Sequence, residues 1–455
     1  MAGLAPLVLI CWIIVSIIFF QKYSPPVAAL LSVFGGSLFL PVYIIDLPGL
    51  PELNKSSIIS IGLLLGGVLS DKSKKYIFKL NAYDLPMILW CFVSPFASSI
   101  SNNLGLYLGL SGSIENFLNW GVIYWAGRKY FSNKDSLHLF SKSFIIGGIA
   151  YAPLILWELR MSPRLNVMIY GYFAHEWRQH FRYGGYRPIV FMNHGIMVAL
   201  FMASSAVLVY WFWKSKYLEK VRNTKISYIA IALIITAIFC RTASGWFFLI
   251  VGIGIFSHYK KKNTTRMIKF LLLFIPVYIF TRISNFITAE MVESIVSYVV
   301  DDERVQSLSV RLLQEDLFSV KALNRPIFGW GGMARAWPVN PETGRELVRM
   351  IDALWIILFA KYGIFGCFNT FLAIGLGPWC LIKYREKTIK YNRGNDSPIP
   401  IDGIVLALLV TFFLLDLLFN GMVNPIYIMC SGAILSFYLR IKNNDVSIEK
   451  SVQSI

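Results

Sequence analysis

Arginine residues of this chain are concentrated where long apolar runs are interrupted. The segment 158–188 is rich in Arg, Tyr and Trp, the segment 283–349 carries a second group, and Arg241 lies alone between two apolar runs. A guanidinium group is planar and can donate two parallel hydrogen bonds, which suits phosphate and carboxylate oxygens. The sequence therefore predicts an anion-binding site. Its candidate ligands are Arg182, Arg187, Arg241, Arg304 and Arg311.

Two of these arginines are placed where their side chains have little freedom. Arg187 precedes Pro188, which suits the first position of a helix, so we expect Arg187 at a helix N-terminus, where backbone N–H groups also favour an anion. Arg241 lies in a very short connection and is expected to point into the mouth of a helical bundle. The alternatives are an interfacial side chain that reaches lipid headgroups for Arg187 and a topological anchor for Arg241.

Two further side chains could serve as a general base toward a hydroxyl group. Asp352 begins a long apolar run and is the first choice, and His194, about two turns into the run after Pro188, is the second. Asp352 could instead be a first-turn acid stabilised by the helix dipole, and His194 a hydrogen-bonded core residue. The sequence does not separate the two. Asp416, in another apolar run, could hydrogen-bond between helices.

The elements that must position these residues are apolar helices. The chain has 455 residues, of which 56% are hydrophobic and 15% charged, against about 25% charged in soluble proteins. Since a membrane span needs roughly 20 apolar residues, we predict an all-α, polytopic membrane bundle of about 12 to 13 spans, forming a single domain over 1–455. An external, partly helical loop is expected at 283–349 and a mobile cytoplasmic tail at 441–455. The predicted spans are 4–20, 27–45, 56–70, 85–101, 114–131, 138–157, 189–213, 227–240, 245–259, 268–282, 351–382, 402–420 and 424–440.

The distribution of basic residues predicts the orientation of the bundle. With the N-terminus outside and the C-terminus in the cytoplasm, nearly all Lys residues fall in cytoplasmic loops and most Arg residues fall outside. Lysine marks the cytoplasmic side because it faces anionic lipid there. The net charge of +18 then follows mainly from these loops, so we expect no nucleic-acid partner.

The sequence contains no pattern for a metal or nucleotide cofactor. It has no Walker A loop, no HExxH, no GxSxG and no DxD motif, and its six cysteines lie inside apolar runs without CxxC spacing. We therefore expect no metal site and no cofactor. If a diphosphate is bound, arginine rather than a cation would neutralise it.

The order of these landmarks resembles the O-antigen ligase and O-antigen polymerase superfamily of bacterial envelope enzymes. In that family, a long external loop carries a helix with an arginine and continues into a Pro-x-x-Gly-x-Gly turn and then a further span. Here Arg311 falls on the loop arginine, which favours it over Arg304, and Pro326-Ile-Phe-Gly329-Trp-Gly331 matches the turn. Tyr186-Arg187-Pro188 resembles an earlier landmark of the family. The resemblance is close over roughly 180–375 and otherwise rests on hydropathy.

The chain also departs from the family pattern. The ligases carry a His-Asn pair where this chain has Asp352-Ala353, and a Glu where it has Lys361. The role proposed for that histidine therefore cannot be transferred. These departures favour a polymerase over a ligase that acts on lipid A-core.

The resemblance implies a fold of the GT-C glycosyltransferase type and a reaction at the outer face of the bacterial plasma membrane. The donor would be an oligosaccharide linked to polyprenyl diphosphate, and the acceptor a sugar hydroxyl. The arginines would stabilise the diphosphate leaving group, while Tyr186 and Trp330 could stack on sugar rings. Membrane lipid and polysaccharide chain-length or export proteins are possible partners. The competing interpretations are a transporter or flippase for an anionic lipid-linked glycan, and a non-catalytic scaffold in an export complex.

Overall fold

The fold is a bundle of apolar helices. The computed structural model describes residues 3–172, 180–297, 302–340, 342–348, 351–391 and 399–453. Helices make up 73% of the structure and strands 3%, which confirms the prediction of an all-α chain. Within the described ranges, five helices are long and apolar enough to cross a membrane, as expected for a membrane protein. They are α1 (Ala5–Lys22), the continuous helix of η1, α5, η2 and α6 (Ala82–Ser101), α9 (Lys134–Met161), α11 (Gly195–Lys214) and α18 (Leu354–Tyr391).

Each of the thirteen predicted apolar runs contains a helix. Two of these helices include a π-helical turn, η2 (Leu89–Val93) and η3 (Phe117–Gly121). The remaining helices of the bundle are α2 (Pro25–Phe39), α3 (Lys55–Leu69), α7 (Leu106–Asn116) continuing through η3 into α8 (Val122–Tyr130), α12 (Ile226–Phe239), α13 (Ala243–Lys262), α14 (Arg266–Ile283), α19 (Ile401–Asp416) and α20 (Pro425–Gln453).

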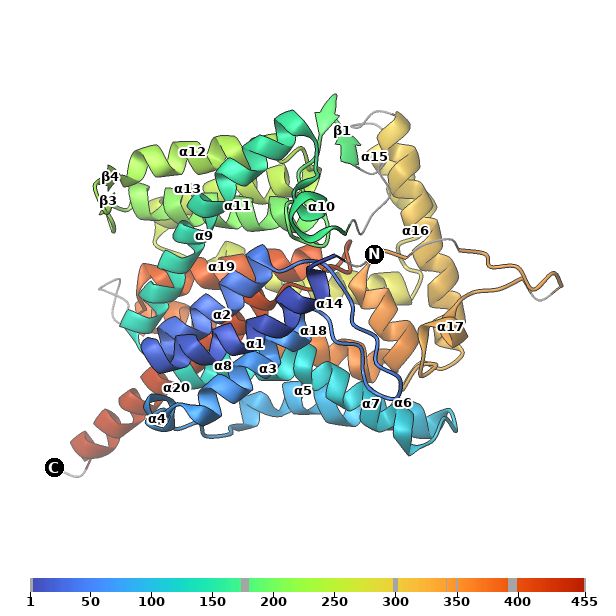
Figure 1. Ribbon diagram of the computed structural model, residues 1–455, viewed down its shortest axis with the longest axis horizontal. Helices are drawn as coiled ribbons and strands as arrows, with labels where there is room; N and C mark the ends of the chain where they lie inside the picture. Colours follow the sequence, from blue (N-terminus) through green and yellow to red (C-terminus); the bar gives the residue numbers. More distant parts are fainter. Residues whose placement is uncertain are drawn as a thin grey trace.

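Short elements cover the two ends of the bundle (Figure 1). At one end lie the antiparallel strands β1 (Phe181–Arg182) and β2 (Gly185–Tyr186), with the helices that follow α14. At the other end lie the hairpin of β3 (Lys220–Val221) and β4 (Thr224–Lys225) and the C-terminus. The other helices are the short α4 (Asp71–Lys74), α10 (Leu165–Tyr170), α15 (Ala289–Val296) and α17 (Met333–Ala336), and the 22-residue α16 (Asp302–Leu323).

The centre of the bundle is formed by α11 and α19. Helix α11 is buried along nearly its whole length and packs against α9, α12, α13 and α19. Every residue of α19 after Ile401 is buried. A helix that is apolar on all sides belongs in such a central position. The N-terminus of α11 and the C-terminus of α19 therefore form a fixed base for the segments that cover this end of the bundle.

The Pro-Ile-Phe-Gly-Trp-Gly turn is inserted into a break in α18. Gly363 has φ 66° and interrupts the helix. The freed backbone groups bond to the turn instead: Ile364 N–H donates to the Pro326 carbonyl (2.8 Å), and Trp330 N–H donates to the Ala360 carbonyl (2.9 Å). A Cβ on Gly329 would lie 2.6 Å from the backbone of residues 361–363, so only glycine fits there. The turn thereby fixes the end of the 283–349 segment to the bundle.

The expected helix start at Pro188 is wrong. Helix α11 begins at Gly195, and the backbone before it is irregular. The buried carboxylate of Glu158 explains the delay, because it accepts hydrogen bonds from the N–H groups of Ile189 (2.8 Å) and Val190 (2.7 Å) and holds them outside a helix. His194 is consequently the N-cap of α11 and does not lie two turns inside it.

The predicted tail at 441–455 continues a helix. Helix α20 runs to Gln453, so the backbone of the described part of this tail is helical. Its mobility and its cytoplasmic location stay predictions.

Candidate functional site

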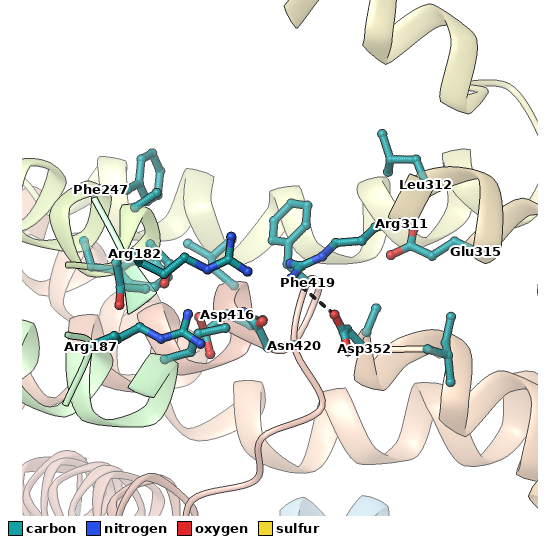
Figure 2. A pocket seen from close by; sticks show the side chains of 18 of the residues that line it. Arg182, Arg187, Phe247, Arg311, Leu312, Glu315, Asp352, Asp416, Phe419 and Asn420 are labelled. Atoms are coloured by element: carbon teal, nitrogen blue, oxygen red, sulfur yellow. Dashed lines mark hydrogen bonds and ion pairs between the residues drawn. The ribbon is translucent and has the colours of Figure 1, made fainter. Parts of the chain in front are cut away.

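A cavity of about 830 Å³ opens where the N-terminal ends of α11 and α13 and the C-terminal end of α19 face the middle of α16. It brings together side chains that lie far apart in the sequence, and Figure 2 shows several of them. The charged residues that line it are Arg182, Arg187, Arg241, Arg311, Glu315, Asp352 and Asp416. Four of the five predicted arginines and the first-choice general base therefore share one cavity.

Arg187 is the most buried arginine of this group. It is 7% exposed, and its Nη2 lies 3.0 Å from Nε2 of His194. Burial, with further contributions from the positive charges of Arg182 and Arg311, lowers the pKa of Arg187 to about 10. The group is still charged at neutral pH, but its charge is held close to two others. Such a cluster is electrostatically unfavourable until an anion joins it.

Arg241 occupies the tight connection between α12 and α13. Its φ of 51° is left-handed, a conformation that costs a non-glycine residue of order 1 kcal/mol or more. The guanidinium group lies directly against Gly185 of strand β2, where a Cβ would come within 1.5 Å of Nη1. Nη1 is buried and has no hydrogen-bond partner among the described residues. A buried donor without a partner is the feature expected of a binding group whose ligand is absent.

Arg311 approaches the cavity from the opposite side, on helix α16 (Figure 2). Its Nη2 lies 3.4 Å from Oδ2 of Asp352, and both side chains are partly exposed to solvent. A solvated ion pair of this kind contributes little stability, about 0 to 1 kcal/mol. It can therefore open at small cost when a ligand takes over either partner.

Arg282 fixes helix α16 in this position. It is 1% exposed, at the end of α14, and its guanidinium group contacts Asp316 (2.8 Å), Glu315 (3.3 Å) and the carbonyl of Leu312 (3.0 Å). The sequence allowed Glu315 to pair with Arg311 one turn earlier, but the carboxylate is bound by Arg282 instead. Arg311 thus stays available to the cavity. The sequence alone did not mark Arg282 as important. Two features could have done so: an arginine at the end of an apolar helix, and the adjacent acids Glu315 and Asp316 further along the chain.

His194 lies outside the residues that line the cavity. Its Nδ1 accepts a hydrogen bond from the N–H of Ile196 (3.2 Å) and so caps α11, and its Nε2 contacts Arg187. Gly195 is part of the same contact, since a Cβ there would meet the Arg187 side chain at 2.8 Å. The geometry therefore supports a role for His194 in holding Arg187, and it leaves Asp352 as the general-base candidate within the cavity.

Two other predicted residues, Tyr186 and Trp330, do not line this cavity, and a third, Arg304, is only partly described. The backbone of Arg304 lies on α16, but its side chain falls outside the described ones. Tyr186 packs edge-on against Phe181 within the β1–β2 hairpin. Trp330 lies in the turn that docks on α18, where Lys321 and Arg325 stack on its ring. Their roles in binding sugars or diphosphate stay predictions.

Asp416 and Asn420 add further polar groups to the lining of this cavity. The Asn420 amide donates to Oδ1 of Asp416 (3.1 Å), while Oδ2 is buried and has no hydrogen-bond partner among the described residues. The sequence suggested that Asp416 hydrogen-bonds between helices, whereas the partner of its Oδ1, Asn420, lies only one turn further along the same segment. The sequence could not show that Asp416 lies in the arginine cavity, because this position depends on how α19 packs against α11.

No metal centre is evident among the residues that the structure describes. Within these ranges, no three or more His, Cys, Asp or Glu side chains lie close enough together to hold a metal ion. No protein-family model matches this chain, and no curated protein matches it either.

Proposed function

We propose that this protein transfers or polymerises oligosaccharide repeat units carried on polyprenyl diphosphate, as a GT-C-type enzyme of the O-antigen ligase and polymerase superfamily. One observation carries the proposal: Arg182, Arg187, Arg241 and Arg311 converge on one cavity that also contains Asp352. Four guanidinium groups in one cavity can bind a multivalent anion, and a diphosphate is such an anion.

The cavity suits the charge changes of such a transfer. The bond between the anomeric carbon and the diphosphate oxygen breaks, and its electron pair stays on that oxygen. A new bond forms between the anomeric carbon and the acceptor oxygen, whose proton passes to the carboxylate of Asp352. Arginines fixed around the diphosphate stabilise the charge that develops on it, and such electrostatic stabilisation usually contributes most to catalysis of this kind.

Aromatic side chains on the same cavity supply a path for the lipid. Phe247 of α13 and Phe270 and Phe274 of α14 line it and are 51%, 68% and 40% exposed. Apolar side chains exposed on a membrane bundle face acyl chains without cost. A polyprenyl chain could thus lie against these rings while its diphosphate meets the arginines. This combination favours a lipid-linked anion over a soluble one.

The proposal includes a location and partners. We place the arginine cavity at the outer face of a bacterial plasma membrane, with about 12 to 13 spans, the N-terminus outside and the C-terminus in the cytoplasm. The charge distribution of the loops supports this orientation. The proposed partners are the lipid-linked donor, membrane lipid, and chain-length or export proteins for the polymer.

A purified-protein assay tests the proposal. Wild-type protein supplied with polyprenyl-diphosphate oligosaccharide should release polyprenyl diphosphate and form longer glycans. Arg187→Ala and Arg311→Ala each remove charge-assisted hydrogen bonds worth about 1.5–3 kcal/mol, so the rate should fall at least about tenfold.

Arg345→Ala is the matched control, because Arg345 is exposed in the same long loop and does not line the cavity. Its activity should equal that of the wild type. Unchanged product lengths in both cavity variants would contradict the proposal. Movement of the intact donor across a proteoliposome membrane, without release of polyprenyl diphosphate, would favour the transporter interpretation instead.

A further inference from the structure

A second cavity, of about 350 Å³, lies on the other side of the wall that bounds the arginine cavity. The segment after α19 separates the two, since Asn420 lines the first cavity and Asn424 the second. The start of α11 does the same, with Ile196 on one side and Met197 on the other. The two cavities therefore share a thin partition at the same end of the bundle.

The lining of the second cavity differs in kind from that of the first. Among the described residues that line it there is no arginine, and the charged side chains are Lys55 and Glu115, one of each sign. Amide and hydroxyl groups supply the rest of its polar surface, among them Asn119, Asn193 and Ser37. Such groups recognise neutral hydroxyls rather than an anion. Trp120, which is otherwise buried, also lines this cavity.

Two polar atoms in this lining lack partners. Oδ1 of Asn119 and Oγ of Ser37 are buried and have no hydrogen-bond partner among the described residues. Buried polar atoms are hydrogen-bonded in the great majority of cases, so two unpaired atoms beside one cavity make it a candidate for a polar ligand. Asn119 is also presented by the π-helical turn η3, and π-turns occur frequently at functional sites.

Lys55 connects the second cavity to the first. Its Nζ donates to the carbonyl of Phe191 (2.7 Å), in the irregular segment that follows Arg187. A ligand that contacts Lys55 is thus coupled to the backbone that carries Arg187, the most buried arginine of the first cavity. This arrangement suits a reaction whose two substrates meet at the partition.

We propose that the second cavity binds the acceptor, the neutral, hydroxyl-rich end of a glycan, with Asn119 and Ser37 as hydrogen-bonding residues. This inference rests on the proposed function, in which the first cavity holds the donor diphosphate. It assigns the two substrates to opposite sides of the partition made by residues 417–424 and the start of α11.

Binding measurements with two separate probes test this assignment. The probes are inorganic pyrophosphate and the neutral oligosaccharide repeat unit released from its lipid by mild acid, each titrated into full-length protein in detergent. Asn119→Ala should weaken oligosaccharide binding about tenfold, the loss of one or two hydrogen bonds, and leave pyrophosphate binding unchanged. Arg241→Gln should have the opposite effect.

Ser37→Ala keeps the inference testable if Asn119→Ala does not fold, because it removes one hydroxyl from a helix and nothing else. Wild-type affinity for the oligosaccharide in both variants, or direct competition between the two probes, would overturn the assignment. Failure of the proposed function gives a different result: the wild type binds the oligosaccharide through Asn119 but forms no new glycosidic bond.

Discussion

At the scale of single residues, the cavity depends on small side chains as much as on arginines. Gly185 and Gly195 have no chemistry of their own, yet the side chains of Arg241 and Arg187 lie directly on them. The sequence located these two arginines but could not assign the glycines a role. Which guanidinium meets which glycine depends on how the β1–β2 hairpin folds over the bundle.

Gly185→Ala should impair donor binding without unfolding the protein. The added Cβ would overlap the Arg241 guanidinium, which is the flexible end of its side chain and can swing away. We expect pyrophosphate affinity to fall about tenfold, with the melting temperature nearly unchanged. Gly254→Ala is the control, because nothing lies within 4 Å of the Cβ it would add. Equal affinity in the two variants would show that Arg241 does not contact the anion.

At the scale of elements, the contact between α14 and α16 sets the position of Arg311. The sequence predicted that the segment 283–349 is partly helical. It could not predict that Arg282 binds Glu315 and Asp316, since that contact joins elements about thirty residues apart. Burial raises the pKa of Glu315 to about 7, although the charge of Arg282 opposes this shift.

This shift predicts a pH dependence of stability. The pKa of Glu315 in the folded protein lies above the value of 4.5 expected for the unfolded chain. The folded state therefore retains the proton longer, and stability should fall as pH rises from about 4.5 to 7, by at most about 3 kcal/mol. Glu315→Gln should remove this part of the slope of melting temperature against pH. Glu342→Gln is the control: Glu342 is exposed, so this variant should keep the wild-type slope of melting temperature against pH. Identical slopes in the wild type and Glu315→Gln would contradict the raised pKa of Glu315.

The presence of the helices could be predicted from the sequence, but their exact boundaries could not. The thirteen apolar runs each contain a helix, because hydrophobic length is a local property of the chain. The start of α11 was misplaced because the carboxylate of Glu158, about thirty residues earlier, takes the backbone N–H groups that a helix would use. Similarly, the predicted span 351–382 included Gly363 as an ordinary helical residue. In the structure Gly363 breaks α18, and the Pro326–Gly331 turn bonds to the backbone at this break.

At the scale of the whole molecule, the bundle places two different cavities on either side of one partition. Four arginines surround the first, and amides and hydroxyls line most of the polar surface of the second. The sequence predicted the convergence of arginines from their residue type and their place between spans. It gave no indication of the second cavity, whose walls come from α2, α3, η3, α11 and the start of α20.

Equilibrium binding of polyprenyl diphosphate to the purified protein tests the central claim most directly. The account predicts that Arg187→Ala and Arg311→Ala each weaken this binding at least about tenfold, while Arg345→Ala binds as the wild type does. Wild-type affinity in both cavity variants would contradict the claim that these arginines hold a diphosphate.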